Sequence, residues 1–219
     1  MTGASADTTA FAFLHGFASG ALSTKGTFLR ERLAARGVPL RTPDLNVPSF
    51  EAMTYSSMLA EIDRLDDAVR PGRWDLIGSS MGGYLAARWA ELRPDRVGRL
   101  VLLCPGFDLP SRWPAMLGER EFLAWERRGW TSVEDGAGRS RELSWSFVED
   151  SRRHPAWPAA VRPTRVLHGV GDEVVPIDGS RRWAAAHDDV ELIELDDDHR
   201  LLRSLATIQA HVEAWFELS

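Results

Sequence analysis

Short apolar runs alternate with longer amphipathic segments along most of this 219-residue chain. Six runs have the length and composition of buried strands: residues 9–14, 38–42, 74–78, 99–104, 164–167 and 190–195. Between them, apolar residues recur every three or four positions, which predicts helices at residues 24–36, 54–69, 84–92, 176–186 and 201–218. This alternation predicts an α/β fold with a mostly parallel sheet of about six strands flanked by helices.

The segment 107–161 interrupts the alternation, because it separates two consecutive strands by more than a simple crossover needs. Residues 118–128 and 144–153 have helical patterns, and Asp135-Gly136 between two short runs predicts a hairpin. The segment also contains five of the nine tryptophans: Trp113, Trp125, Trp130, Trp145 and Trp157. We therefore expect residues 1–219 to form a single domain, with a small α-rich cap insertion at about 107–161 covering one end of the sheet.

Composition and charge exclude several classes of protein. The net charge is −6 and no basic run occurs, which argues against a nucleic-acid partner. No stretch reaches the roughly 18 consecutive apolar residues of a membrane span. The first residues lack the features of a signal peptide, so we expect a cytoplasmic protein with no membrane partner. Cys104 is the only cysteine. The sequence therefore indicates no metal and no cofactor, and it leaves the oligomeric state open.

The main chemical signal is Gly78-Ser79-Ser80-Met81-Gly82, between a predicted strand and a predicted helix. Strand, G-x-S-x-G and helix together form a nucleophile elbow, a sharp turn that exposes a serine hydroxyl at the end of a sheet. Only Ser80 has glycine two residues away on both sides, so Ser80 is the candidate nucleophile. The pattern also arises by chance in a Gly-rich chain, and a tightly packed turn without chemistry is the alternative.

A serine nucleophile needs a base to take its proton and an acid to orient that base. Asp172 and His199 each follow a predicted strand, in the order Ser, acid, His that this fold uses. Taken alone, Asp172 could be a turn cap, and His199 could be a solvated loop residue. Their occurrence together with Ser80, in this order, favours a catalytic role. Glu173 is a competing acid, although Asp172 lies nearer to the strand end. The remaining histidines fit the role of the base less well: His15, His154, His168, His187 and His211.

The tetrahedral intermediate of acyl transfer needs N–H donors for its oxyanion. In this arrangement they come from the residue after the nucleophile, Met81, and from the loop after an early strand, at Phe17. We interpret His15 as structural. The aromatic content of the insertion further predicts an apolar acyl pocket, although core packing is the more ordinary role of any single tryptophan. The predicted substrate-binding residues are Gly16, Phe107, Trp113, Trp125, Trp130, Trp145 and Leu201.

These pieces together resemble the α/β-hydrolase superfamily. The matching motifs are Leu14-His15-Gly16-Phe17, Gly78 to Gly83, His168-Gly169 with Asp172 and Val175-Pro176, and Asp198-His199-Arg200-Leu201. Within the superfamily the chain is similar to small single-domain esterases and acyl-thioesterases, with which it shares His-Gly-Phe-Ala-Ser, Thr24-Lys25-Gly26 and residues 143–150. The resemblance implies an α/β-hydrolase fold that lacks its first two strands. It also implies a Ser80, Asp172 and His199 catalytic triad.

We therefore predict a serine hydrolase of carboxylesterase or thioesterase type. It would cleave a small-molecule ester or thioester with a small to medium acyl group, through an acyl-enzyme on Ser80. Two alternatives stay open, because fold alone does not fix function. One is a small-molecule receptor or signalling module on a hydrolase scaffold, and the other is a cofactor-free perhydrolase. The natural acyl and leaving groups are not determined by the sequence.

Overall fold

A parallel sheet forms the centre of the computed structural model, which describes residues 8–136 and 138–218. Its six strands have the order β2-β1-β3-β4-β7-β8, and every neighbouring pair is parallel. They are β1 (Thr9–Leu14), β2 (Leu40–Arg41), β3 (Arg73–Ser79), β4 (Val97–Leu103), β7 (Thr164–Gly169) and β8 (Val190–Leu195). The α/β fold class and the six strands predicted from the sequence are confirmed.

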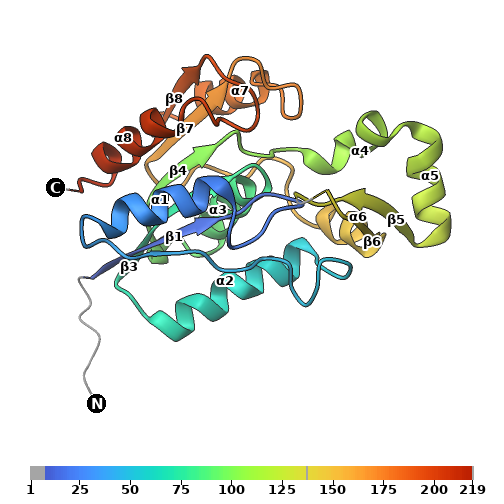
Figure 1. The fold of residues 1–219 in the computed structure, drawn as a ribbon, viewed down its shortest axis with the longest axis horizontal. Helices are drawn as coiled ribbons and strands as arrows, with labels where there is room; N and C mark the ends of the chain where they lie inside the picture. The colour runs from blue at the N-terminus through green and yellow to red at the C-terminus, as the bar shows by residue number, and fades with distance from the viewer. Residues whose placement is uncertain (1–7, 137, 219) are drawn as a thin grey trace.

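Helices cover both faces of the sheet (Figure 1). They are α1 (Thr24–Ala34), α2 (Tyr55–Val69), α3 (Met81–Leu92), α7 (Asp178–Ala185) and α8 (Leu205–Trp215), with a short 3₁₀ turn at Pro94–Arg96. Leu76 of β3 belongs to a core cluster that includes residues of α2 and α3, whereas its neighbour Ile77 belongs to one that includes residues of α1 and α8. Successive side chains of a strand point to opposite faces, so each face has a core of its own.

The register of the sheet brings the strand ends to one edge. Leu14 pairs with Gly78, Ser79 with Leu103, and Gly169 with Leu195. The loops that follow β1, β3, β4, β7 and β8 therefore start side by side. Ligands of open α/β sheets bind at this carboxyl edge, where these loops carry the candidate site.

The insertion between β4 and β7 lies at one end of the molecule in Figure 1. It comprises α4 (Leu109–Leu117), α5 (Glu119–Arg128), the antiparallel pair β5 (Trp130–Glu134) and β6 (Ser140–Ser144), and α6 (Ser146–Ser151). The predicted hairpin and the two predicted helices are present. The helix α4 is not among the predicted ones, because it contains Pro110 in its first turn and Pro114 in its interior. Proline in a sequence predicts the end of a helix. In a first turn, however, proline is tolerated, because the N–H that it lacks would have no partner within the helix.

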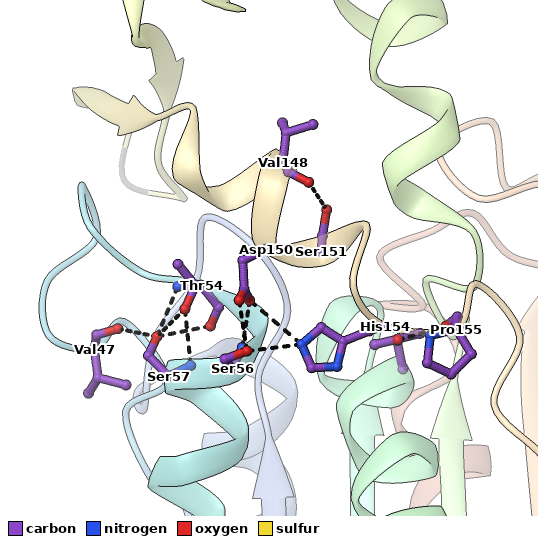
Figure 2. Close-up of polar contacts among 10 residues, drawn as sticks. Val47, Thr54, Ser56, Ser57, Val148, Asp150, Ser151, His154 and Pro155 are labelled. Atoms are coloured by element: carbon purple, nitrogen blue, oxygen red, sulfur yellow. Dashed lines mark hydrogen bonds and ion pairs between the residues drawn. The ribbon is translucent and has the colours of Figure 1, made fainter.

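Polar contacts attach the insertion to α2, as Figure 2 shows. The backbone N–H and the hydroxyl of Ser56 donate to the Asp150 carboxylate of α6 at 2.8 and 2.7 Å, and Nε2 of His154 lies 3.1 Å from Ser56 Oγ. Thr54 and Ser57 form a capping box at the same helix end. A carboxylate is favourable there, because the helix dipole is positive at its N-terminus. The insertion is therefore held against α2.

Candidate active site

Ser80 occupies a strained turn between β3 and α3. Its φ of 54° and ψ of −118° lie in a region that side chains other than glycine rarely adopt. A Cβ at Gly78 would lie 2.3 Å from the Gly82 carbonyl oxygen, and a Cβ at Gly82 would lie 2.1 Å from that of Leu14. Glycine at both positions is therefore a steric requirement. The strain is held by the surrounding backbone, since Ser80 N–H donates to the Leu103 carbonyl at 2.8 Å.

The structure brings Ser80, His199 and Asp172 together from the loops after β3, β8 and β7. Nε2 of His199 lies 3.1 Å from Ser80 Oγ, and Nδ1 of His199 lies 2.7 Å from Asp172 Oδ2. A carboxylate only accepts hydrogen bonds, so Nδ1 carries the proton and Nε2 can accept the serine proton. Glu173, the competing acid, is exposed. The arrangement can generate a serine nucleophile.

The Asp172 side chain is fully buried. Its Oδ1 accepts the backbone N–H groups of Val174 at 2.9 Å and Val175 at 2.7 Å, while Nε2 of His168 lies 3.1 Å from Oδ2. Burial raises the pKa of this carboxyl, but hydrogen bonds from His168, His199 and Val175 outweigh it and hold the pKa well below its usual range. Asp172 is therefore ionised and keeps the Nδ1 proton of His199 in place.

His168 is a neighbour of the site that the sequence analysis did not assign to it. Its Nε2 faces two acceptors, Asp172 Oδ2 at 3.1 Å and the Val175 carbonyl at 2.8 Å, and therefore carries a proton. Its Nδ1 lies 2.8 Å from Ser180 Oγ. The ring is completely buried. The Nε2–H of His168 thus donates to the Val175 carbonyl and lies close to the carboxylate oxygen that accepts from His199. Only the fold reveals this, because a histidine at a strand end has many roles.

The residues proposed for the oxyanion hole are next to the nucleophile. Among the described residues, no oxygen accepts a hydrogen bond from the N–H groups of Phe17 or Met81. A Cβ at Gly16 would lie 3.2 Å from Ser80 Cβ, so the Gly16 backbone passes close to the nucleophile. The ring of His15 is used structurally: Nε2 accepts from the Leu45 N–H at 2.9 Å and Nδ1 donates to the Gly16 carbonyl at 2.9 Å. Two amides are thereby available for an oxyanion.

A cleft of about 1010 Å³ opens beside Ser80 and His199. Gly16, Phe17 and Lys25 line it, together with Arg200 and residues of the β5–β6 turn. A second cavity of about 340 Å³ lies between Tyr84, α4 and α6 and shares no lining residue with the cleft. Ser80 and His199 therefore open onto the first cleft and not onto the second cavity.

Most residues predicted to bind substrate do not line this cleft, and their part in an acyl pocket stays a prediction. Of the predicted set, Gly16 lines the cleft, whereas Phe107, Trp113, Trp125, Trp130, Trp145 and Leu201 do not. The rings of Trp113, Trp125 and Trp145 are buried and meet edge-to-face at 5.3 and 5.4 Å. These three rings belong to the same core cluster as Leu76 of β3, so the insertion packs onto the main core.

The other members of that set have different surroundings. Phe107 stacks on Trp183, with 4.7 Å between the ring centroids. Trp130 is 42% exposed, beneath the Arg128 guanidinium. Leu201 is fully buried in the core beneath α1 and α8. Trp113 has an indirect link to the site, because its ring contacts that of Phe17 at 5.5 Å.

One group of possible metal ligands occurs within residues 8–136 and 138–218: Cys104, His168 and Asp172. Both ring nitrogens of His168 and both oxygens of Asp172 already have hydrogen-bond partners in the protein. Burial also raises the pKa of the Cys104 thiol, which disfavours the thiolate that binds metals. We therefore interpret this group as support for Asp172.

The contacts of Ser56, Asp150 and His154 differ from those of a nucleophilic triad, although the residue types are the same (Figure 2). The Ser56 hydroxyl donates directly to the Asp150 carboxylate at 2.7 Å. In a triad the serine donates to the histidine, and the acid contacts the histidine but not the serine. This second group therefore stabilises the junction between α2 and α6.

A parallel sheet with helices on both faces and a strained serine turn at its carboxyl edge is characteristic of the α/β hydrolases, and this chain has that fold. Within this class it belongs to the family described as Uncharacterised protein family (UPF0227), which matches residues 10–217.

Characterised relatives share part of the sequence. The mouse (Mus musculus) palmitoyl-protein thioesterase ABHD10, mitochondrial, is 32% identical over 146 residues, which are 63% of this chain and 48% of the relative. The pimeloyl-[acyl-carrier protein] methyl ester esterase of Nitrosomonas europaea is 25% identical over 166 residues, 59% of this chain and 66% of the relative. The chain thus spans about half the length of the mouse relative and two thirds of the bacterial one.

Solved structures share the fold over nearly the whole chain. Alpha/beta hydrolase domain-containing protein 10 from mouse superimposes with a TM-score of 0.80 at 23% identity, covering 95% of this chain and 89% of that one. Est1E from Butyrivibrio proteoclasticus superimposes with a TM-score of 0.78 at 19% identity, covering 96% and 87%. Among the described helices, none is long and apolar enough to cross a bilayer.

Proposed function

We propose that this protein is a serine hydrolase that cleaves a carboxylic ester or thioester through an acyl-enzyme on Ser80. The observation that carries the proposal is the position of His199, with Nε2 3.1 Å from Ser80 Oγ and Nδ1 2.7 Å from Asp172. The relatives support the reaction class, since their names describe a thioesterase and a methyl ester esterase.

The reaction follows from these contacts. Ser80 Oγ bonds to the carbonyl carbon while its proton moves to Nε2 of His199, and the negative charge on the carbonyl oxygen is met by the N–H groups of Phe17 and Met81. The intermediate collapses, the bond to the alcohol or thiol breaks, and the leaving group takes the proton from His199. Water then repeats the sequence on the acyl-enzyme, which releases the acid and restores the Ser80 hydroxyl.

Turnover and active-site labelling together test the proposal. The purified protein should hydrolyse 4-nitrophenyl acetate or butyrate over many cycles and should be labelled once by a fluorophosphonate probe. Ser80→Ala should lose both properties and still unfold cooperatively. Ser132→Ala is the matched control, because Ser132 is exposed on β5 and does not line the cleft. Turnover by a folded Ser80→Ala protein would refute the assignment of the nucleophile.

The same experiment separates the alternatives. Labelling of Ser80 without turnover of any ester or thioester would favour a receptor on a hydrolase scaffold, and turnover only with peroxide would favour a perhydrolase. The cytoplasmic location stays a prediction, because the printed name of the mouse relative includes the word mitochondrial. Fractionation of the source cells, with the protein detected by antibody, tests it.

A further inference from the structure

Lys25 is the only lysine among the 26 basic residues of this chain. Every other one of them is arginine. The exception lines the same cleft as Ser80 and His199. Because lysine presents a compact ammonium on a flexible stem, whereas arginine presents a broad planar fork, the two are not interchangeable. The single lysine thus places a compact cation in the cleft.

Lys25 lies in the first turn of α1 and reaches the loop that carries the catalytic histidine. Its Nζ donates to the carbonyl oxygen of Arg200 at 2.8 Å, across 175 positions of sequence. An ammonium has three donors, so this contact leaves two of them for another acceptor. Within the described part of the chain, no carboxylate lies within ion-pair distance of Nζ.

A half-buried cation without a carboxylate partner is costly. Burial lowers the pKa of Lys25, while Arg200 adds a second positive charge nearby and Asp198 and Asp172 oppose the shift. Asp198 forms no ion pair with the ammonium, and its Oδ1 accepts from the Arg200 N–H at 2.8 Å. The Arg200 guanidinium is exposed and lines the cleft beside His199. Within residues 8–136 and 138–218, neither Lys25 nor Arg200 forms an ion pair with a carboxylate.

Acidic residues line other parts of the cleft. Asp135 pairs with Arg139 in the β5–β6 turn, and Glu134 lies on the same hairpin. Asp44 accepts the side-chain N–H of Asn46 at 2.8 Å. Arg139 and Arg141 also line the cleft, but they pair with Asp135 and Glu51. Among the described residues of the lining, Lys25 and Arg200 are therefore the cations left to orient a substrate with a negative group.

We propose that Lys25 and Arg200 form a subsite for an anionic group, a carboxylate or a phosphate, on the ester or thioester substrate. This inference rests on the proposed function and narrows its substrate class. The anion replaces the missing partner of the Lys25 ammonium. The group can belong to the acyl part or to the leaving group, and matched substrates separate these two sources.

Two pairs of esters that differ mainly by one carboxylate provide the test. The pair 4-nitrophenyl butyrate and 4-nitrophenyl hemisuccinate places the charge on the acyl group. The pair phenyl acetate and 4-acetoxybenzoate places it on the leaving group. In wild type, kcat/KM should be higher for the charged member of one pair, and this preference should weaken at high ionic strength because salt screens the attraction.

Substitution of Lys25 should then reduce the ratio of charged to neutral kcat/KM in that pair. We expect a loss of about tenfold or more for Lys25→Met, the range expected for losing a hydrogen bond to a charged group, and a smaller loss for Lys25→Arg. Arg127→Gln is the charge-matched control, since Arg127 is exposed on α5 and does not line the cleft. If Lys25→Met lowers kcat/KM for charged and neutral esters by the same factor, Lys25 only anchors the His199 loop, and the inference is overturned.

A binding measurement keeps this result separate from the proposed function. Because Lys25 is the only lysine, selective ¹⁵N-lysine labelling gives one ε-ammonium resonance. Titration with succinate and with 4-hydroxybenzoate should shift it, whereas neutral butyramide should not. A shift without ester turnover would support the anion subsite and reject the hydrolase. Turnover with no shift from either anion, and no preference for a charged ester, would reject the subsite and keep the hydrolase.

Discussion

His168 offers a direct test of how the buried acid is supported. Oδ2 of Asp172 accepts from His199 at 2.7 Å and lies 3.1 Å from Nε2 of His168. His168→Leu removes the Nε2–H group near Asp172. It replaces the imidazole ring with an apolar side chain, which suits a site with no solvent access. It also removes the ring partner of the Ser180 hydroxyl.

The expected magnitude follows from these contacts. A hydrogen bond to a charged group contributes about 1.5–3 kcal/mol, and each buried polar group left without a partner costs about 1–3 kcal/mol. We therefore expect the free energy of unfolding to fall by about 3 kcal/mol. With one donor fewer, the pKa of the Asp172 carboxyl should rise toward its usual range. The acid limb of the pH–rate profile should therefore move to higher pH.

Urea unfolding and kcat/KM for 4-nitrophenyl butyrate between pH 5 and 9 measure the two effects. His168→Gln should restore part of both, because its side-chain amide can donate to Asp172. His187→Gln is the matched control, since His187 Nδ1 contacts the Trp183 carbonyl and the residue does not line the cleft. A His168→Leu protein with the stability and pH profile of wild type would show that His168 does not support Asp172.

Three further predictions follow from the site and the core. Asp172→Asn should lower kcat by roughly a hundredfold or more, because the wrong His199 tautomer is favoured, whereas Glu173→Gln should not; equal losses would contradict the choice of acid. Trp125→Ala should cost about 3–5 kcal/mol in urea unfolding by opening a core cavity, and Trp130→Ala much less; a changed acyl-chain profile in kcat/KM with normal stability would instead place Trp125 at the pocket. Burial raises the pKa of Asp75 to about 6, so its ionisation opposes folding as pH rises above 3.8. Asp75→Asn should therefore stabilise the protein by up to about 3 kcal/mol at pH 8 and by little at pH 4; urea curves that do not diverge with pH would refute this.

The hydrophobic pattern of the sequence was enough to predict most strands and helices of this fold. The strands alternate with helices, and a buried parallel strand is a short apolar run whatever it contacts. Gly78 and Gly82 were predictable as well, because a turn this tight leaves no space for a Cβ at either position. The order Ser80, Asp172, His199 after three strand ends placed these residues at one edge of the sheet, because parallel strands end together.

Only the tertiary structure decided which aromatic residues face the cleft. The composition of residues 107–161 indicates apolar contacts but not their direction. Trp113, Trp125 and Trp145 pack on one another and join the main core cluster. The contacts of His168 and Lys25 could not be predicted from the sequence either. The loop after β7 turns back so that Asp172 contacts His168, and Lys25 contacts Arg200, 175 positions away. The hydrophobic periodicity of a helix or strand predicts that one of its faces is buried. Which residues that face contacts depends on how the helices and strands pack together.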